Sequence, residues 1–344
     1  GSIVFDAGPT VDADPACAAA VISFEPSNFV RCDVPDPLGA IDILAGEVGE
    51  INTDSGAFEV DGVTVPLANA SVSQSDGSDL LVIGLDRLHV RSTARLLFTG
   101  SRPVAIVSLS EIRIEGTVDI GAVNVNDGAG ANPSACGGGA NGEAQQATNT
   151  TQIAASGGGG GGYGASGGVG AQVINGGEDS LGGAGNGNPE LIPLRGGCQG
   201  GDGGSATGGA GGGGGGALQL VAADLIRVDS GGILTSQGGG VRDTLFTFSA
   251  GGGGGSGGAL LLEAPELRIV GSVTANGGGG GEGTRGGNTA NPGEDGHMDD
   301  ASPASHFAVA HVIYWAVRPC GSLIAAMGGV EAIAFTGGIG ENAA

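Results

Sequence analysis

The chain of 344 residues contains no lysine, because all 12 of its basic residues are arginines. This absence excludes a phosphate-loop lysine, a Schiff-base lysine and a lysine-rich surface for nucleic acids. Aromatic residues make up only 3% of the sequence, which is too few for the core of an ordinary globular enzyme. No apolar run is long enough to cross a bilayer, so we expect no membrane span.

Positive charge is scarce as well. The sequence has 36 acidic residues against its 12 arginines, and its net charge is −24. A chain this acidic repels DNA, RNA and anionic membrane surfaces, so we expect no nucleic-acid partner. The macromolecular partners that remain open are an extracellular polymer and a cell-surface component.

Cysteine is limited to five residues. Pairing of Cys17 with Cys32, and of Cys136 with Cys198, would close two loops and would indicate an oxidising compartment. Four cysteines allow three connectivities, and four free buried thiols are the alternative interpretation. Cys320 is then left without a partner. We therefore expect the part of the chain with the four paired cysteines to be extracellular or exposed on a cell surface.

Glycine, by contrast, is abundant at 77 residues, and it separates three copies of one sequence pattern. Each copy has a short apolar strand, a polar corner, a strand with a central arginine, a glycine turn and a third short strand. The copies cover residues 104–120, 217–233 and 259–275. Alternation of apolar and polar residues is typical of a strand with one buried face.

The repeat predicts the fold class. Three short strands make roughly 20 residues per turn, the size of one coil of a solenoid whose stacked coils supply the core. We therefore expect an all-β chain, a right-handed parallel β-helix with glycine-rich excursions. Its central arginines, Arg113, Arg227 and Arg268, should point outward in register. The alternative is a β-sandwich of unrelated strands.

The sequence divides into segments of different composition. We expect a tether at 1–16, of the kind that follows a cleaved secretion signal, an N-terminal cap with strands at 17–70, a glycine-rich β-solenoid at 71–300 and a separate segment at 305–344. The absence of an initiator methionine suggests a mature form or a fragment. His89 lies between two apolar residues of a strand, so it should face outward and is expected to be a solvated surface residue.

The most glycine-rich stretch, residues 122–216, allows three interpretations: a disordered linker, polyglycine helices packed side by side, or an excursion from one corner of the solenoid. We favour the excursion, because the repeat resumes directly at Ala217. Acidic residues at 177–179 and 200–202 suggest calcium, although the nine-residue period of calcium-binding β-rolls is absent. Residues 149–151 fit a glycosylation acceptor.

The last 40 residues have a different character. Residues 307–317 show a helix-like apolar pattern, 321–329 read as a helix of small residues, and 330–336 read as a buried strand that leads into a glycine turn. The sequences His311-Val-Ile-Tyr-Trp and Phe335-Thr-Gly-Gly-Ile-Gly-Glu-Asn resemble the C-terminal nucleotide-binding segment of acetate kinases. This short α/β fragment would thus belong to a second fold.

The resemblance implies a binding site for the adenosine of ATP. Its contacts would be Gly338, Ile339, Gly340, Glu341 and Asn342. Residues 3–10 also have the outline of the first phosphate loop of the same superfamily, but residues 11–15 follow where a second strand is expected. Mg²⁺ belongs to the family's reaction, yet the metal-binding glutamate and the surrounding arginine and histidine motifs are missing, so no catalytic residue is assigned.

Two functions follow from these observations. The first is a non-catalytic structural or interaction β-solenoid outside the cell that carries a truncated ATP-binding tail. The second is a cytoplasmic member of the acetate kinase family that transfers phosphate between ATP and acetate. A bare adenosine loop cannot perform that transfer, because phosphoryl transfer depends on positioning and charge stabilisation.

Overall fold

The computed structural model describes residues 17–142, 144–145, 154–170, 180–185, 187–204, 208–241, 250–282 and 332–336. Within these residues the chain is built of strands and extended segments, with two short 3₁₀ helices, η1 (Ala18–Val21) and η2 (Arg31–Asp33). The expectation of an all-β chain is therefore confirmed for the described part.

Three sheets hold all but two of the described strands. Sheet A contains, in spatial order, β1 (Ile41–Ile43), β7 (Leu88–Val90), β10 (Glu111–Ile114), β15 (Leu225–Val228) and β18 (Glu266–Ile269). Sheet B contains β19 (Ser272–Thr274), β16 (Ile233–Thr235), β11 (Thr117–Asp119), β8 (Arg95–Thr99), β2 (Val48–Asn52), β3 (Ala57–Val60) and β4 (Val63–Val65). Sheet C contains β20 (Ala332–Thr336), β17 (Ala259–Glu263), β14 (Ala217–Ala222), β9 (Val104–Ser108), β6 (Asp79–Leu85) and β5 (Ala68–Ser73). The remaining pair is antiparallel, β12 (Ala144–Gln145) with β13 (Ala154–Ala155).

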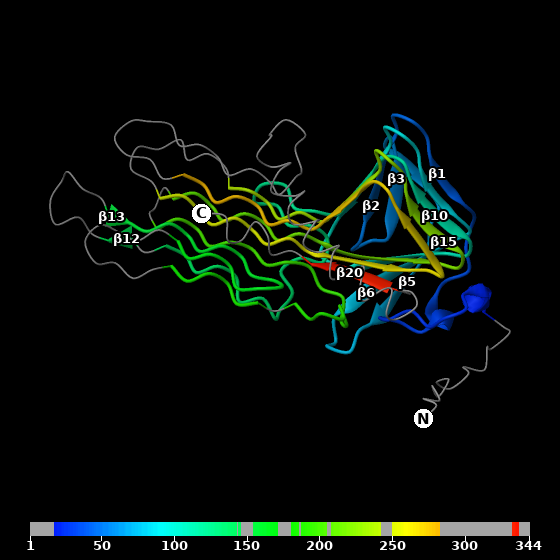
Figure 1. Ribbon diagram of the computed structural model, residues 1–344, viewed down its shortest axis with the longest axis horizontal. Helices are drawn as coiled ribbons and strands as arrows, with labels where there is room; N and C mark the ends of the chain where they lie inside the picture. The colour runs from blue at the N-terminus through cyan, green and yellow to red at the C-terminus, as the bar shows by residue number, and fades with distance from the viewer. Residues whose placement is uncertain are drawn as a thin grey trace, which may run out of the picture.

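The chain visits the three sheets in a fixed order. From β6 to β19 it passes from sheet C to A to B four times, and each strand pairs in parallel with the equivalent strand of the previous round. Figure 1 shows strands such as β10 and β15 side by side within one sheet. Arg113, Arg227 and Arg268 occupy equivalent positions on adjacent strands, which confirms the expected register.

Antiparallel strands finish the sheets. At one end β3 and β4 extend sheet B as a meander, and β5 pairs with β6 at the margin of sheet C. At the other end β20 pairs antiparallel with β17. Antiparallel additions of this kind cover the main-chain groups that a parallel edge would leave unpaired.

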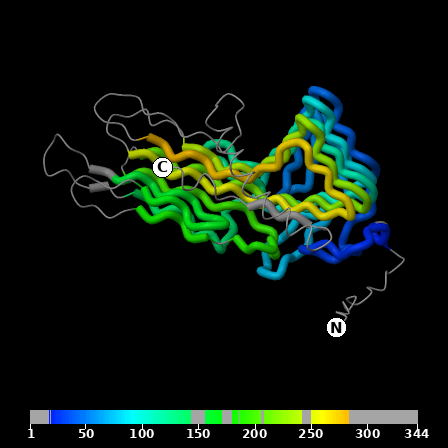
Figure 2. Tube along the Cα trace, viewed as in Figure 1, coloured from blue at the N-terminus to red at the C-terminus, as the bar shows by residue number. Residues whose placement is uncertain are grey.

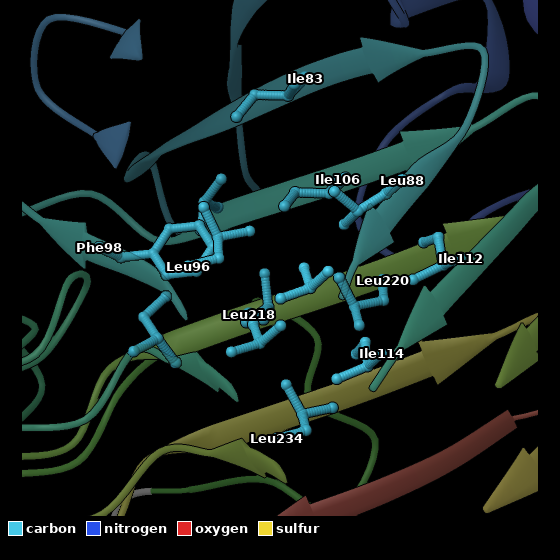
Figure 3. Close-up of a cluster of buried hydrophobic side chains, with 14 of the residues drawn as sticks. Ile83, Leu88, Leu96, Phe98, Ile106, Ile112, Ile114, Leu218, Leu220 and Leu234 are labelled. Atoms are coloured by element: carbon cyan, nitrogen blue, oxygen red, sulfur yellow. The ribbon is translucent and has the colours of Figure 1, made fainter. Parts of the chain in front are cut away.

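The main core lies between the three sheets. Figure 3 shows side chains from each of them pointing toward one another, for example Ile106 from β9, Ile112 from β10 and Leu96 from β8. All three are essentially inaccessible to solvent. The alternating residues between them face outward, as the period of two in a strand requires.

Sheet C is covered on its outer face as well. The segment 17–34, closed by the Cys17–Cys32 disulfide, packs there in a second apolar cluster. Phe29 and Val34 from this segment lie with Val107 of β9 and Val221 of β14. Figure 1 shows this N-terminal segment beside the strands β5 and β6. Because both faces are buried, β9, β14 and β17 are buried along their whole lengths.

A buried polar contact fastens this segment. The carboxylate of Glu263, which is only 4% exposed, accepts a hydrogen bond from the Ser27 hydroxyl at 2.5 Å and another from the Ser27 amide at 3.2 Å. Gln219 donates its side-chain amide to the same carboxylate, and the Asn28 amide donates to the Gln219 carbonyl at 3.1 Å. The chain of donors satisfies a carboxylate that burial would otherwise disfavour.

The glycine-rich segments leave the sheets at the corner between sheets B and C, after β11, β16 and β19. This placement confirms the expected excursion. Figure 2 shows these segments as neighbouring extended traces that project away from the stacked strands. We call them the glycine bundle, which comprises residues 136–142, 156–162, 165–170, 180–185, 195–204, 208–216, 236–241, 250–258 and 275–282.

Hydrogen bonds in the glycine bundle follow a period of three. The amides of Gly158 and Gly161 donate to the carbonyl oxygens of Gly251 and Gly254 on one neighbouring segment, at 3.0 and 2.9 Å. The two amides between them donate to two other segments: Gly159 donates to Ala140, and Gly160 donates to Gly168. Three residues per turn without internal hydrogen bonds is the geometry of the polyproline II helix. The excursion and the packed polyglycine helices are thus the same structure.

Close packing explains why the residues are glycine. A Cβ atom on Gly253 would lie 2.0 Å from the carbonyl oxygen of Gly159, and one on Gly255 would lie 1.9 Å from that of Gly213. Both distances are far inside van der Waals contact, and the obstructing atoms belong to the backbone of another segment of the bundle. The second predicted disulfide, Cys136–Cys198, is present and joins two segments of the bundle.

Candidate functional site

The outer face of sheet A carries a ladder of charged side chains. Register places Asp42, His89, Arg113, Arg227 and Arg268 at equivalent positions of five neighbouring strands. Adjacent strands lie about 4.8 Å apart, so three arginines follow one another at that spacing. Like charges on directly opposite residues destabilise a sheet unless carboxylates compensate them.

Asp229 and Glu115 supply that compensation around Arg113. Arg113 contacts Glu115 at 2.5 Å and donates to Asp229 at 2.9 Å, while Arg227 donates to Asp229 at 2.5 Å. Burial alone would raise the pKa of Asp229, but the hydrogen bonds from Arg113 and Arg227 outweigh it and hold this pKa below its usual range. The bond to Asp229 likewise raises the pKa of Arg113. Asp229 is therefore ionised at neutral pH.

His89 faces outward, as expected, but it is not solvated. Only 12% of its side chain is exposed, because it lies between two carboxylates. Its Nδ1 is 3.8 Å from Asp42 and its Nε2 is 3.6 Å from Glu115. The expectation of a solvated surface histidine is wrong here, since neighbouring strands bring acidic side chains to both sides of the ring.

A cleft opens beside this ladder, where the strands of sheet A turn into sheet B. Its volume is about 560 Å³. Charged and hydroxyl-bearing side chains line it together with two glycines. The lining residues are Ser92, Thr93, Arg95, Arg113, Glu115, Gly116, Thr117, Asp229, Ser230 and Gly231.

None of the residues of the predicted nucleotide site is among those that the structure describes. Gly338, Ile339, Gly340, Glu341 and Asn342 lie outside the described residues, as do the candidate phosphate loop at 3–10 and the glycosylation acceptor at 149–151. Of residues 305–344, only β20 is described, and it matches the strand expected at 330–336. No feature of the described residues bears on ATP or Mg²⁺.

The calcium hypothesis also gains no support from the residues placed by the structure. Residues 177–179 lie outside the described part, and the carboxylate of Asp202 accepts a hydrogen bond from the amide of Gly211 at 2.8 Å. Within the described segments, no three His, Cys, Asp or Glu side chains converge on a point where a metal ion could bind. Asp202 instead completes the hydrogen bonding of the glycine bundle.

The cleft was not anticipated from the sequence, although a signal for it exists. The link between a strand of sheet A and the following strand of sheet B has four residues at 91–94, two at 115–116 and four at 229–232. A short corner between two long ones leaves a notch. Comparing the lengths of equivalent links would have located it.

Comparison with known proteins gives this chain no relatives: no family model, no curated protein and no solved structure matches it. Among the described residues, no helix has the length and apolar character needed to cross a membrane.

Proposed function

We propose that this chain is a non-catalytic structural and interaction module that acts outside the cytoplasm. The observation that carries the proposal is the disulfide between Cys136 and Cys198, whose Cα atoms are 5.6 Å apart. It joins two segments of the glycine bundle, and Cys17–Cys32 closes the segment that covers sheet C. Disulfides persist in oxidising compartments and are rare in the cytoplasm.

We further propose that the three sheets form a right-handed parallel β-helix. The repeated order of sheets C, A and B, with in-register parallel pairing between rounds, supports this architecture. Crossover connections between parallel strands of one sheet are almost always right-handed, which favours that hand. Stacked rounds would give a rigid support from which the glycine bundle projects.

Location tests the function directly. Antibodies against the folded chain should detect it in the secreted or cell-surface fraction of its native source, with a cytoplasmic enzyme as the fractionation control. Recovery of the folded chain, with both cysteine pairs reduced, in the cytoplasmic fraction alone would overturn the proposal.

The tail supports a second, separate proposal. The resemblance to acetate kinases, together with the strand β20 that precedes the predicted glycine turn, favours binding of the adenosine of ATP without phosphoryl transfer. Calorimetric titration of the full chain with MgATP should show binding that Gly338→Val abolishes. Formation of acetyl phosphate from ATP and acetate would instead favour the kinase alternative, and absence of nucleotide binding would remove both.

A further inference from the structure

The cleft beside the charged ladder is produced by the lengths of three stacked corners. The corners at 91–94 and 229–232 each have four residues, whereas the one between them, at 115–116, has two. Neighbouring strands lie about 4.8 Å apart, so the two long corners stand about 10 Å from each other. The short corner forms the floor between them.

The floor of the cleft is tightly fixed. A Cβ atom on Gly116 would lie 2.3 Å from the carbonyl oxygen of Ala94 and 2.4 Å from that of Arg91, so only glycine allows the short corner to sit this close. One wall contains Thr93 with a φ of 66°. A left-handed backbone is rare for a β-branched residue, and such residues are enriched at functional sites.

The chemistry of the cleft is polar throughout. Glu115 and Asp229 hold Arg113, and Asp229 also accepts a hydrogen bond from Arg227. A carboxylate has about four lone-pair sites, so both side chains keep the capacity to accept a further hydrogen bond. Arg95 lines the same cleft, is exposed, and forms no side-chain hydrogen bond or ion pair with the described part of the chain. Hydroxyl groups of Ser92, Thr117 and Ser230 complete the lining.

We propose that this cleft binds a carboxylated sugar, that is, a hexuronate unit of an acidic glycan. The guanidinium of Arg95 would bind the carboxylate, since arginine binds carboxylates with two parallel hydrogen bonds. Glu115 and Asp229 would accept hydrogen bonds from sugar hydroxyls. This ligand assignment rests on the proposed role of the chain as an interaction module.

Other ligand classes fit the cleft less well. A simple carboxylate would use Arg95 alone and would leave the two acceptors without donors. A neutral sugar would leave the guanidinium without its best partner. A protein surface would need an apolar centre, and the lining contains no aliphatic or aromatic side chain.

The test compares three probes on the full, disulfide-bonded chain. Saturation-transfer NMR titrations would use D-galacturonate, D-galactose and acetate; small probes keep the net charge of −24 from dominating. We expect galacturonate to bind at least tenfold more tightly than either galactose or acetate. Equal binding of galactose, equal binding of acetate, or no saturable binding of galacturonate would each overturn the assignment.

Two variants locate the binding. Arg95→Gln should weaken galacturonate binding at least tenfold and leave the melting temperature unchanged, because Arg95 forms no side-chain hydrogen bond or ion pair with the residues that the structure describes. Arg87→Gln is the matched control, since Arg87 is an exposed arginine that does not line the cleft. An equal loss in both variants, or none in Arg95→Gln, would overturn the proposal. A negative result would overturn only the ligand assignment. The proposed role as an interaction module outside the cytoplasm is tested separately, by the location of the chain and by its disulfides.

Discussion

Arg113 and Arg227 lie opposite each other on adjacent parallel strands, and both donate to the single carboxylate of Asp229. Without that carboxylate, two guanidinium groups would face each other at the spacing of neighbouring strands, about 4.8 Å. Like charges directly opposite are destabilising in a sheet. Asp229 therefore permits the outward row of arginines that the sequence repeat imposes.

We expect Asp229→Asn to lower the free energy of unfolding by about 1 kcal/mol, because the side chain is largely covered but the pair is partly screened by solvent. The effect should depend on pH. The native pKa of Asp229 is lowered, so its contribution is fully present above the unfolded value of about 3.9 and is lost as the pH falls through the lower native value. Urea unfolding at pH 7 and pH 3 measures this. Asp224→Asn, at an exposed carboxylate, is the control, and equal effects of the two variants would contradict the account.

The parallel register makes a prediction about cross-linking. Glu111 and Leu225 are direct partners on adjacent strands, whereas Glu266 lies one strand further. In a Cys320→Ser background, Glu111→Cys with Leu225→Cys should form a disulfide on mild oxidation. Glu111→Cys with Glu266→Cys should not, because its Cα atoms would be about 10 Å apart and disulfides need less than about 7 Å. Equal yields of both cross-links would contradict the register.

Much of this register was predictable from the sequence, because alternation and the central arginine repeat at equivalent places. The sequence predicts the strands around Arg113, Arg227 and Arg268, and it allows both disulfides as one of three possible connectivities. The cover over sheet C was not. Its signal lay in Val104–Ser108, which is apolar on both faces and is typical of a strand buried on both sides.

The glycine bundle could be located but not resolved from the sequence. Polyglycine has no side chains and hence no periodic pattern, so nothing in Gly251–Gly255 indicates which other segments it contacts. The partners, such as Gly201 for the amide of Gly253, are distant in sequence and are set by backbone hydrogen bonds alone. Propensity therefore left three interpretations open.

Packing of the glycine bundle predicts a position-specific effect of alanine. Gly253→Ala should lower the free energy of unfolding by about 1–3 kcal/mol, because its Cβ would overlap the carbonyl oxygen of Gly159. Gly280→Ala should have little effect, since its Cβ would lie 3.4 Å from the nearest atom, the carbonyl oxygen of Gly252. Calorimetry compares the two variants. Equal tolerance of alanine at both positions would mean that the chains are not packed in this way.

The contact between Ser27 and Glu263 predicts a third stability effect. Ser27→Ala removes the hydroxyl donor from a buried carboxylate and should lower the free energy of unfolding by about 1–3 kcal/mol. Ser101→Ala removes a similar bond, to the exposed carboxylate of Asp54, and should cost no more than about 0.5 kcal/mol. Chemical denaturation distinguishes them, and a loss of similar size in both would show that the segment 17–34 does not cover sheet C.

The central claim is a disulfide-linked glycine bundle in an oxidising compartment. Its most direct test is whether Cys136 is paired with Cys198 in the native protein. Trypsin should cleave after Arg113, Arg195 and Arg227, which places the two cysteines in separate peptides, 114–195 and 196–227. In native protein alkylated before digestion without reduction, the account predicts one linked species that reduction separates into these two peptides. Recovery of both peptides unlinked, each with an alkylated thiol, would contradict it.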